Sequence, residues 1–186
     1  MALMRVYAAV AALIVSAGAI STADAFDREN VIGGKKLSSF ASVYIAPVAL
    51  NLDQGRDERP IRDKDAARRA NDFHDDLVDE FSDAFDIADM PGAGVLTIEA
   101  TLTKLVATRP TLADFSEQPG LGFESVYAGG AAFSATLSEA GETLAEIGDR
   151  HTSNLGDGAP KIATWQDADR AFSLWSRQLV DFVQEN

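Results

Sequence analysis

Two segments of the chain carry large apolar side chains at the spacing of an α-helix, and this pattern constrains the fold more than any other feature. The first segment spans Asp63–Ala88, and its stripe consists of Ala66, Ala70, Phe73, Leu77, Phe81, Ala84, Phe85 and Ala88. The second begins at Thr164, where Asp167 three residues on predicts a variant capping box. Its stripe consists of Trp165, Ala168, Phe172, Trp175, Leu179 and Phe182. Because each helix has one apolar stripe, we expect both to cover the same face of one sheet.

The strands of that sheet are predicted from short β-favouring segments. Val43–Val48 is apolar, and Val95–Val106 alternates between apolar and polar residues, as expected of a strand with one buried face. Ala131–Ser138 and Thr143–His151 flank Glu139–Glu142, which has the composition of a hairpin turn with Gly at a position of positive φ. The order predicts an α+β two-layer sandwich: a mostly antiparallel sheet of about four strands, with two amphipathic helices packed on one face.

The N-terminal segment has the pattern of an export signal. Met1–Arg5 carries one positive charge, Val6–Ile20 is apolar and uncharged, and Ala23 and Ala25 form an A-x-A cleavage pattern. We therefore predict a signal peptide over residues 1–25, an extended arm over residues 26–39 and a single α+β domain over residues 40–186. Cleavage at about Ala25 would give a periplasmic or secreted protein. The alternative is an uncleaved N-terminal anchor.

The charge and the cysteine count exclude several classes of function. The chain contains 16 Lys and Arg residues and 29 Asp and Glu residues, which gives a net charge of −13, and it contains no cysteine. Nucleic acid is not an expected partner, because phosphate backbones are bound by clustered cationic side chains. Disulfides and thiolate chemistry are excluded, and a lipidated export signal would need a Cys at the cleavage point.

No catalytic, cofactor-binding or metal-binding residue is predicted. His74 lies at the edge of the first helical stripe and is interpreted as a half-buried histidine with one hydrogen bond. His151 ends a predicted strand and is interpreted as a rim residue. The alternative function is a hydrolase, which would require one of these histidines in a cleft with a hydrogen-bonded acid.

A second alternative is a cation-binding protein that uses the acidic helix 63–88. Asp72, Asp76, Asp79 and Asp83 lie on one face at helical spacing, and we interpret this face as solvated. Asp83, Asp86 and Asp89 lie near the end of the helix, where the helix dipole disfavours negative charge. Their position suggests that this end meets a cationic partner or a basic patch.

Two surfaces are predicted to bind a partner. One is the exposed strand edge near Pro47, because proline cannot donate a hydrogen bond to a further strand. The other is Thr108–Gly130, which is long for a loop in a compact domain and carries Phe115, Phe123 and Tyr127 in or beside it.

Four short motifs, in order, resemble the bacterial envelope proteins grouped as "domain of unknown function 3313". They are Val43-Tyr44-Ile45-Ala46-Pro47-Val48, Pro91-Gly92-Ala93-Gly94-Val95-Leu96, Gly141-Glu142-Thr143-Leu144-Ala145 and Trp165…Ala168…Ala171-Phe172…Trp175. The resemblance implies an exported envelope protein, usually lipid-anchored, with no assigned activity or catalytic residues. Because the anchoring Cys is missing, a free periplasmic protein is favoured, with no stable membrane anchor after cleavage. The predicted function is a non-catalytic binding or accessory module of the cell envelope, whose partner is an envelope protein, a wall polymer or a lipid.

Overall fold

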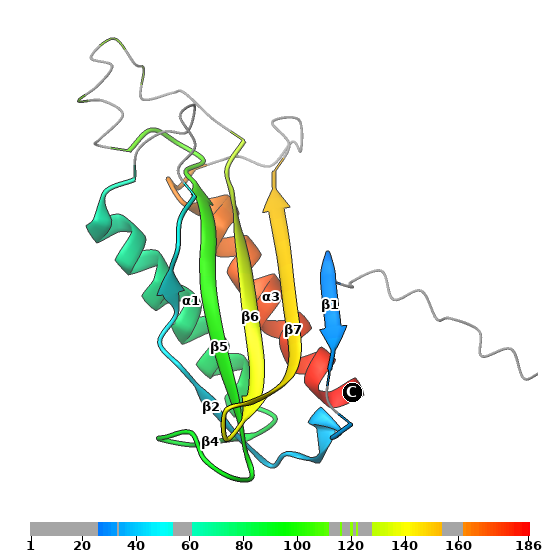
Figure 1. The fold of residues 1–186 in the computed structure, drawn as a ribbon. Coiled ribbons are helices and arrows are strands. Elements are labelled where there is room, and N and C mark those ends of the chain that lie inside the picture. Colours follow the sequence, from blue (N-terminus) through cyan, green and yellow to red (C-terminus); the bar gives the residue numbers. More distant parts are fainter. Residues whose placement is uncertain are drawn as a thin grey trace, which may run out of the picture.

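The computed structural model has two layers, a sheet and a pair of long helices that both lie on one face of it (Figure 1). It describes residues 26–32, 34–53, 61–111, 116, 120, 122, 128–153 and 162–186. The predicted signal peptide, residues 1–25, lies outside the described residues and stays a prediction. No helix of the described part is both long and apolar enough to cross a membrane. The predicted α+β class is confirmed.

Among the described residues the sheet has seven strands in the order β1-β7-β6-β5-β2-β4, and β3 also pairs with β5. The strands are β1 (Arg28–Val31), β2 (Ser42–Ile45), β3 (Ala49–Leu50), β4 (Asp86–Ile87), β5 (Val95–Val106), β6 (Gly130–Glu139) and β7 (Glu142–Thr152). The pairs that join β1, β7, β6 and β5 are antiparallel, whereas β2 and β3 run parallel to β5, and β4 runs parallel to β2.

The prediction of about four mostly antiparallel strands is therefore inexact. Helix α1 (Asp63–Ser82) carries the chain back between β2 and β5, and such a crossover leaves two neighbouring strands parallel. The segment 26–39, expected as an extended arm, supplies β1 at one edge of the sheet and a short 3₁₀ helix, Leu37–Ser39. Phe26 and Leu37 from this segment are buried in the core.

Both apolar stripes are buried within their helices, as predicted, but Ala84, which follows the first helix, is exposed, and Phe85 and Ala88 are only partly buried. Phe73 of α1 stacks on Phe172 of α3 (Gln166–Glu185), with 4.9 Å between the ring centroids. Phe133 of β6 lies 5.6 Å from Phe73 and 4.6 Å from Trp175, so the three elements share one aromatic cluster. The Trp175 indole Nε1 donates a hydrogen bond of 2.6 Å to Asp149 Oδ2 on β7, which satisfies its buried polar atom.

The ends of the two helices differ from the prediction. Helix α1 ends at Ser82 rather than Ala88, because the next residues turn and Asp86–Ile87 pairs with β2 as β4. Helix α3 begins at Gln166, and its N-cap is Trp165, with no side-chain capping bond. The predicted capping box does not form, because Asp167 is buried and bonds to two other segments of the chain.

The predicted hairpin between β6 and β7 is confirmed. Ala140 and Gly141 form its two-residue turn, with φ of 49° and 87°. Positive φ at both central positions is the signature of a type I′ turn, whose twist matches that of the strands it joins.

Candidate functional site

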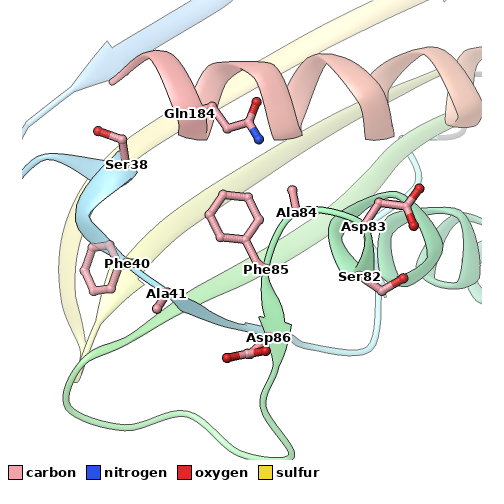
Figure 2. Close-up of a pocket in the computed structure, with 9 residues that line it drawn as sticks. All are labelled: Ser38, Phe40, Ala41, Ser82, Asp83, Ala84, Phe85, Asp86 and Gln184. Carbon is pink, nitrogen blue, oxygen red and sulfur yellow. The ribbon is translucent and has the colours of Figure 1, made fainter.

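A hollow of about 580 Å³ lies where three segments meet at one end of the sandwich; we call it the basal hollow (Figure 2). The link between the 3₁₀ helix and β2, the turn between α1 and β4, and the end of α3 line it. The lining residues are Ser38, Phe40, Ala41, Ser82, Asp83, Ala84, Phe85, Asp86 and Gln184. Its volume falls in the range of small-ligand sites, about 300–1,000 Å³.

The basal hollow combines aromatic surface with negative charge. Figure 2 shows the Phe85 ring pointing toward the helix that carries Gln184, with Phe40 on one side and Asp83 on the other. Phe40 is 5% exposed, and Phe85 packs against the core at 5.6 Å from the Phe81 ring. No Lys or Arg is among the lining residues, and the last turn of α1 contains no basic residue.

Lys35, a basic residue that contacts the Phe40 ring, already has an acidic partner. Lys35 Nζ lies 4.3 Å from the centroid of the Phe40 ring and pairs with the Glu139 carboxylate at 2.5 Å. Glu139 also accepts a hydrogen bond of 2.8 Å from the Gly94 amide. The Lys35 hydrogen bond, followed by the Gly94 amide, lowers the pKa of Glu139 below its ordinary value. The Asp83 and Asp86 carboxylates therefore keep their charge unpaired among the described residues.

The acidic face of α1 is only partly solvated, which corrects the interpretation from sequence. Arg69, whose side chain is 13% exposed, pairs with Asp72 on its own helix and with Asp169 of α3, the latter at 2.6 Å. Asp76 accepts a hydrogen bond of 3.1 Å from the Ser173 hydroxyl of α3. Two of the four predicted face residues, Asp72 and Asp76, thus belong to a polar contact network between the helices.

Burial raises the pKa of Asp76 above its ordinary value, against the opposing effect of the Ser173 hydrogen bond. Burial also raises the pKa of Asp169, although the Arg69 guanidinium opposes this shift. These raised pKa values have a structural cause, the close packing of α1 on α3, and do not by themselves indicate catalysis.

The two histidines lie on different elements. His74 of α1 is half-buried, and its Nε2 lies 3.4 Å from the Ile45 carbonyl of β2, which matches the predicted single contact. Its Nδ1 is 3.6 Å from Asp75 Oδ1, beyond hydrogen-bond distance. His151 of β7 is partly exposed and lies opposite Ala131. Strands β5 and β6 separate β2, which His74 contacts, from β7, which carries His151, and neither histidine lines the basal hollow.

A buried polar cluster at the other end of the sandwich was not predicted as such. Asp167 Oδ2 accepts hydrogen bonds from Thr108 Oγ1 at 2.9 Å and from Ser153 Oγ at 2.7 Å, and all three residues are buried. A Cβ added at Gly129 would lie 2.4 Å from Thr108 Oγ1, so the cluster fits only around glycine. Within the described ranges, no group of three or more His, Cys, Asp or Glu side chains could hold a metal ion.

The two predicted binding surfaces have different outcomes. Pro47 is exposed between β2 and β3, and β4 covers β2 only at Ser42 and Val43, so the edge beyond Val43 carries no further strand among the described residues. Most of Thr108–Gly130 lies outside the described residues, including Phe115, Phe123 and Tyr127, and its predicted role is untested.

Comparison with known proteins gives one family and a set of distant structures. The family model "Protein of unknown function (DUF3313)" matches residues 22–179. No curated protein matches the chain. The PelC dodecamer from Paraburkholderia phytofirmans is similar at 9% identity and a TM-score of 0.46, over 81% of this chain and 97% of that chain.

Two further solved structures are similar at the same level. A Xanthomonas campestris protein of family model DUF330 has 14% identity and a TM-score of 0.47, over 80% of this chain and 86% of that chain. A DUF4136 family protein from Bacteroides thetaiotaomicron has 10% identity and a TM-score of 0.39, over 84% of this chain and 95% of that chain. At these values the likenesses carry no argument about ligand, partner or assembly.

Proposed function

The chain belongs to the DUF3313 family, and from that premise we propose that it is an exported, non-catalytic binding module of the bacterial cell envelope. Its binding site is the basal hollow. Its ligand is a lysine or arginine side chain of a partner envelope protein. The observation that carries this proposal is the position of the partly exposed Phe85 ring beside two unpaired carboxylates in one hollow.

The chemistry of a basic side chain matches both parts of the hollow. Its alkyl stem can pack on apolar surface while its charged head stays near water. Here the stem would lie against Phe85, because Phe40 is almost fully buried, and the head would reach Asp83 or Asp86 at the rim. Hydrogen bonds between ionised partners are about twice as strong as neutral ones. The negative end of the α1 dipole adds to the attraction.

Titration with small probes tests the site directly. We expect N-acetyl-arginine amide and N-acetyl-lysine amide to shift the backbone amide resonances of Ala41, Phe85 and Gln184 in nuclear magnetic resonance spectra. N-acetyl-norleucine amide, which keeps the alkyl stem without the charge, should bind at least fivefold more weakly. Equal binding of the three probes would show that the carboxylates play no part.

A matched pair of variants separates the rim carboxylates from the overall charge. Asp83→Asn with Asp86→Asn should weaken binding of the arginine probe at least fivefold. Asp79→Asn with Asp181→Asn makes the same change in net charge on exposed helical positions outside the hollow and should leave binding within twofold. If both double variants lose the same affinity, the attraction comes from the whole molecule and the proposed site is wrong.

Export is tested separately. The full chain, produced in a Gram-negative host, should appear in the periplasmic fraction with a mass that lacks about 25 N-terminal residues. Recovery of the unprocessed chain from the cytoplasm would contradict the proposed location without bearing on the hollow.

A further inference from the structure

Figure 1 shows that one face of the sheet, which we call the open face, is turned away from α1 and α3. A further hollow among the described residues lies on this face. Phe133 and Asp149 point toward the helices, since their side chains contact Trp175. Their neighbours along the strands, Ala132, Ser134, Gly148 and Arg150, therefore point to the open face. The hollow has a volume of about 320 Å³ and is lined by Asp27, Arg28, Thr103, Ala132, Phe133, Ser134, Gly148, Asp149 and Arg150.

We propose that this open-face hollow binds a phosphoryl group, as carried by a soluble phosphate ester, between Arg28 and Arg150. This site is independent of the basal hollow, and neither proposal depends on the other.

Strand register brings the two arginines together. Arg28 of β1 lies opposite Gly148 of β7, and Arg150 follows Gly148 by two residues on the same face. Diagonal neighbours of this kind lie about 7–8 Å apart, with their Cβ atoms somewhat closer, well within reach of two long side chains. The two guanidinium groups can therefore converge on one ligand placed over Gly148.

Both arginines are available. Neither forms an ion pair or a side-chain hydrogen bond within the described residues. Both are exposed, although the protein carries 29 acidic residues that could have paired with them. Asp27 and Asp149 line the same hollow, yet neither pairs with Arg28 or Arg150, so both guanidinium groups can bind an external anion.

Small residues leave room for that anion. Gly148 lies inside a β-strand, where glycine weakens the strand and often marks the close approach of a ligand. Ala132 and Ser134 flank it on β6. A Cβ added at Gly148 would lie 3.2 Å from the Phe133 carbonyl oxygen and at least 3.8 Å from other atoms, so β6 would have to shift by a few tenths of an ångström to admit a side chain there.

The number of donors favours phosphate over carboxylate. Two guanidinium forks, together with the Thr103 and Ser134 hydroxyls at the hollow, supply more donors than the two oxygens of a carboxylate can engage in paired geometry. A phosphoryl group offers three oxygens, so it can accept from both forks at once.

The surrounding charge favours a soluble ester over a membrane surface. Glu99 and Glu146 lie on the open face, both opposite Thr136 and one row from Arg28, and Asp27 and Asp149 line the hollow. These carboxylates and the net charge of −13 would oppose contact with an anionic bilayer. A single phosphate ester, in contrast, would meet only the two adjacent rows that contain Arg28 and Arg150.

Titration with inorganic phosphate and glycerol 3-phosphate, followed by nuclear magnetic resonance of the Gly148 amide and the arginine Nε–H groups, tests the site. Both probes should shift these resonances, and acetate should bind at least fivefold more weakly. Absence of any shift at 50-fold excess of phosphate would overturn the proposal. Acetate binding as tightly as phosphate would overturn the assignment to a phosphoryl group.

Two variants and a control distinguish the site from general charge. Arg28→Gln with Arg150→Gln should weaken phosphate binding at least tenfold. Arg68→Gln with Arg177→Gln, at exposed positions on the two helices, makes the same charge change and should leave it within twofold. Gly148→Ala keeps every charge but places a methyl group in the hollow, and should weaken binding at least threefold. Equal losses in the two double variants would contradict the proposal.

Sedimentation with vesicles of phosphatidylglycerol tests the source of the phosphoryl group. The protein should stay in the supernatant. Binding to these vesicles that disappears in the Arg28→Gln, Arg150→Gln variant would contradict the assignment to a soluble ester.

Discussion

The turn between β6 and β7 places an alanine where the backbone favours other residues. Ala140 has a φ of 49° in the first central position of the type I′ turn, and Gly141 occupies the second. A residue with a Cβ pays about 1–2 kcal/mol in the left-handed region, and asparagine tolerates it better than alanine.

We therefore expect Ala140→Asn to raise the free energy of unfolding by about 0.5–1 kcal/mol, measured by urea denaturation. Ala140→Gly should act in the same direction. Ala140→Val is the control that keeps an apolar side chain but adds β-branching, and it should be less stable than the natural protein. A lower stability for Ala140→Asn would show that the turn does not limit the hairpin.

The contact between α1 and α3 joins apolar packing to a partly buried polar network. Asp76 lies in that network beside Ser173, and burial raises its pKa. The folded protein therefore holds the Asp76 proton more tightly than the unfolded chain does. Its contribution to stability falls as the pH rises from the ordinary value of 3.8 through the raised pKa, and at neutral pH the ionised carboxylate is a net cost.

Asp76→Asn removes that cost, and its amide oxygen can still accept the Ser173 hydrogen bond. We expect a higher melting temperature than the natural protein at pH 7, and a difference that shrinks as the pH is lowered toward 3.8. Asp181→Asn, at an exposed position of α3, is the matched control and should change little. If Asp76→Asn melts at a lower temperature at pH 7, the hydrogen bond to the ionised carboxylate outweighs its desolvation.

The helices and strands that were predicted correctly are those whose apolar residues repeat with a regular period. The stripes of α1 and α3 and the alternation in β5 each extend over many residues, so several positions agree on one structure. Strands β3 and β4 contain two residues each, too few to show any period. The parallel pairing of β2 with β5 depends on the path of the chain through α1. A short stretch of sequence does not indicate that path.

At the scale of the whole molecule, the candidate sites have no continuous signal in the sequence. The basal hollow joins residues from the first, middle and last thirds of the chain. Arg28 and Arg150 meet only because β1 adds to β7 at the edge of the sheet. The acidic residues at the end of α1 indicated a binding surface, because their charges are unfavourable at that end of the helix dipole. That aromatic rings lie beside these residues follows only from the fold.

Removal of the predicted signal peptide would change the charge at one edge of the whole structure. The Phe26 backbone nitrogen lies 3.0 Å from Glu29 Oε1, and the Phe26 ring is buried against Phe133 and Phe182. Cleavage after Ala25, which rests on the proposed export, would make that nitrogen a charged amine and the contact an ion pair.

We expect the chain that begins at Phe26 with a free amine to be more stable at pH 6, by about 0.5–1 kcal/mol, than the same chain with an acetylated terminus. Urea denaturation of the two forms measures this difference. It should vanish at pH 10, where an α-amine with an ordinary pKa of about 8 is neutral. It should also vanish in Glu29→Gln, which keeps the hydrogen bond but removes the charge. A difference that persists in Glu29→Gln would mean that the amine acts through another group. An ion pair with Glu29 would then not be the cause of the added stability.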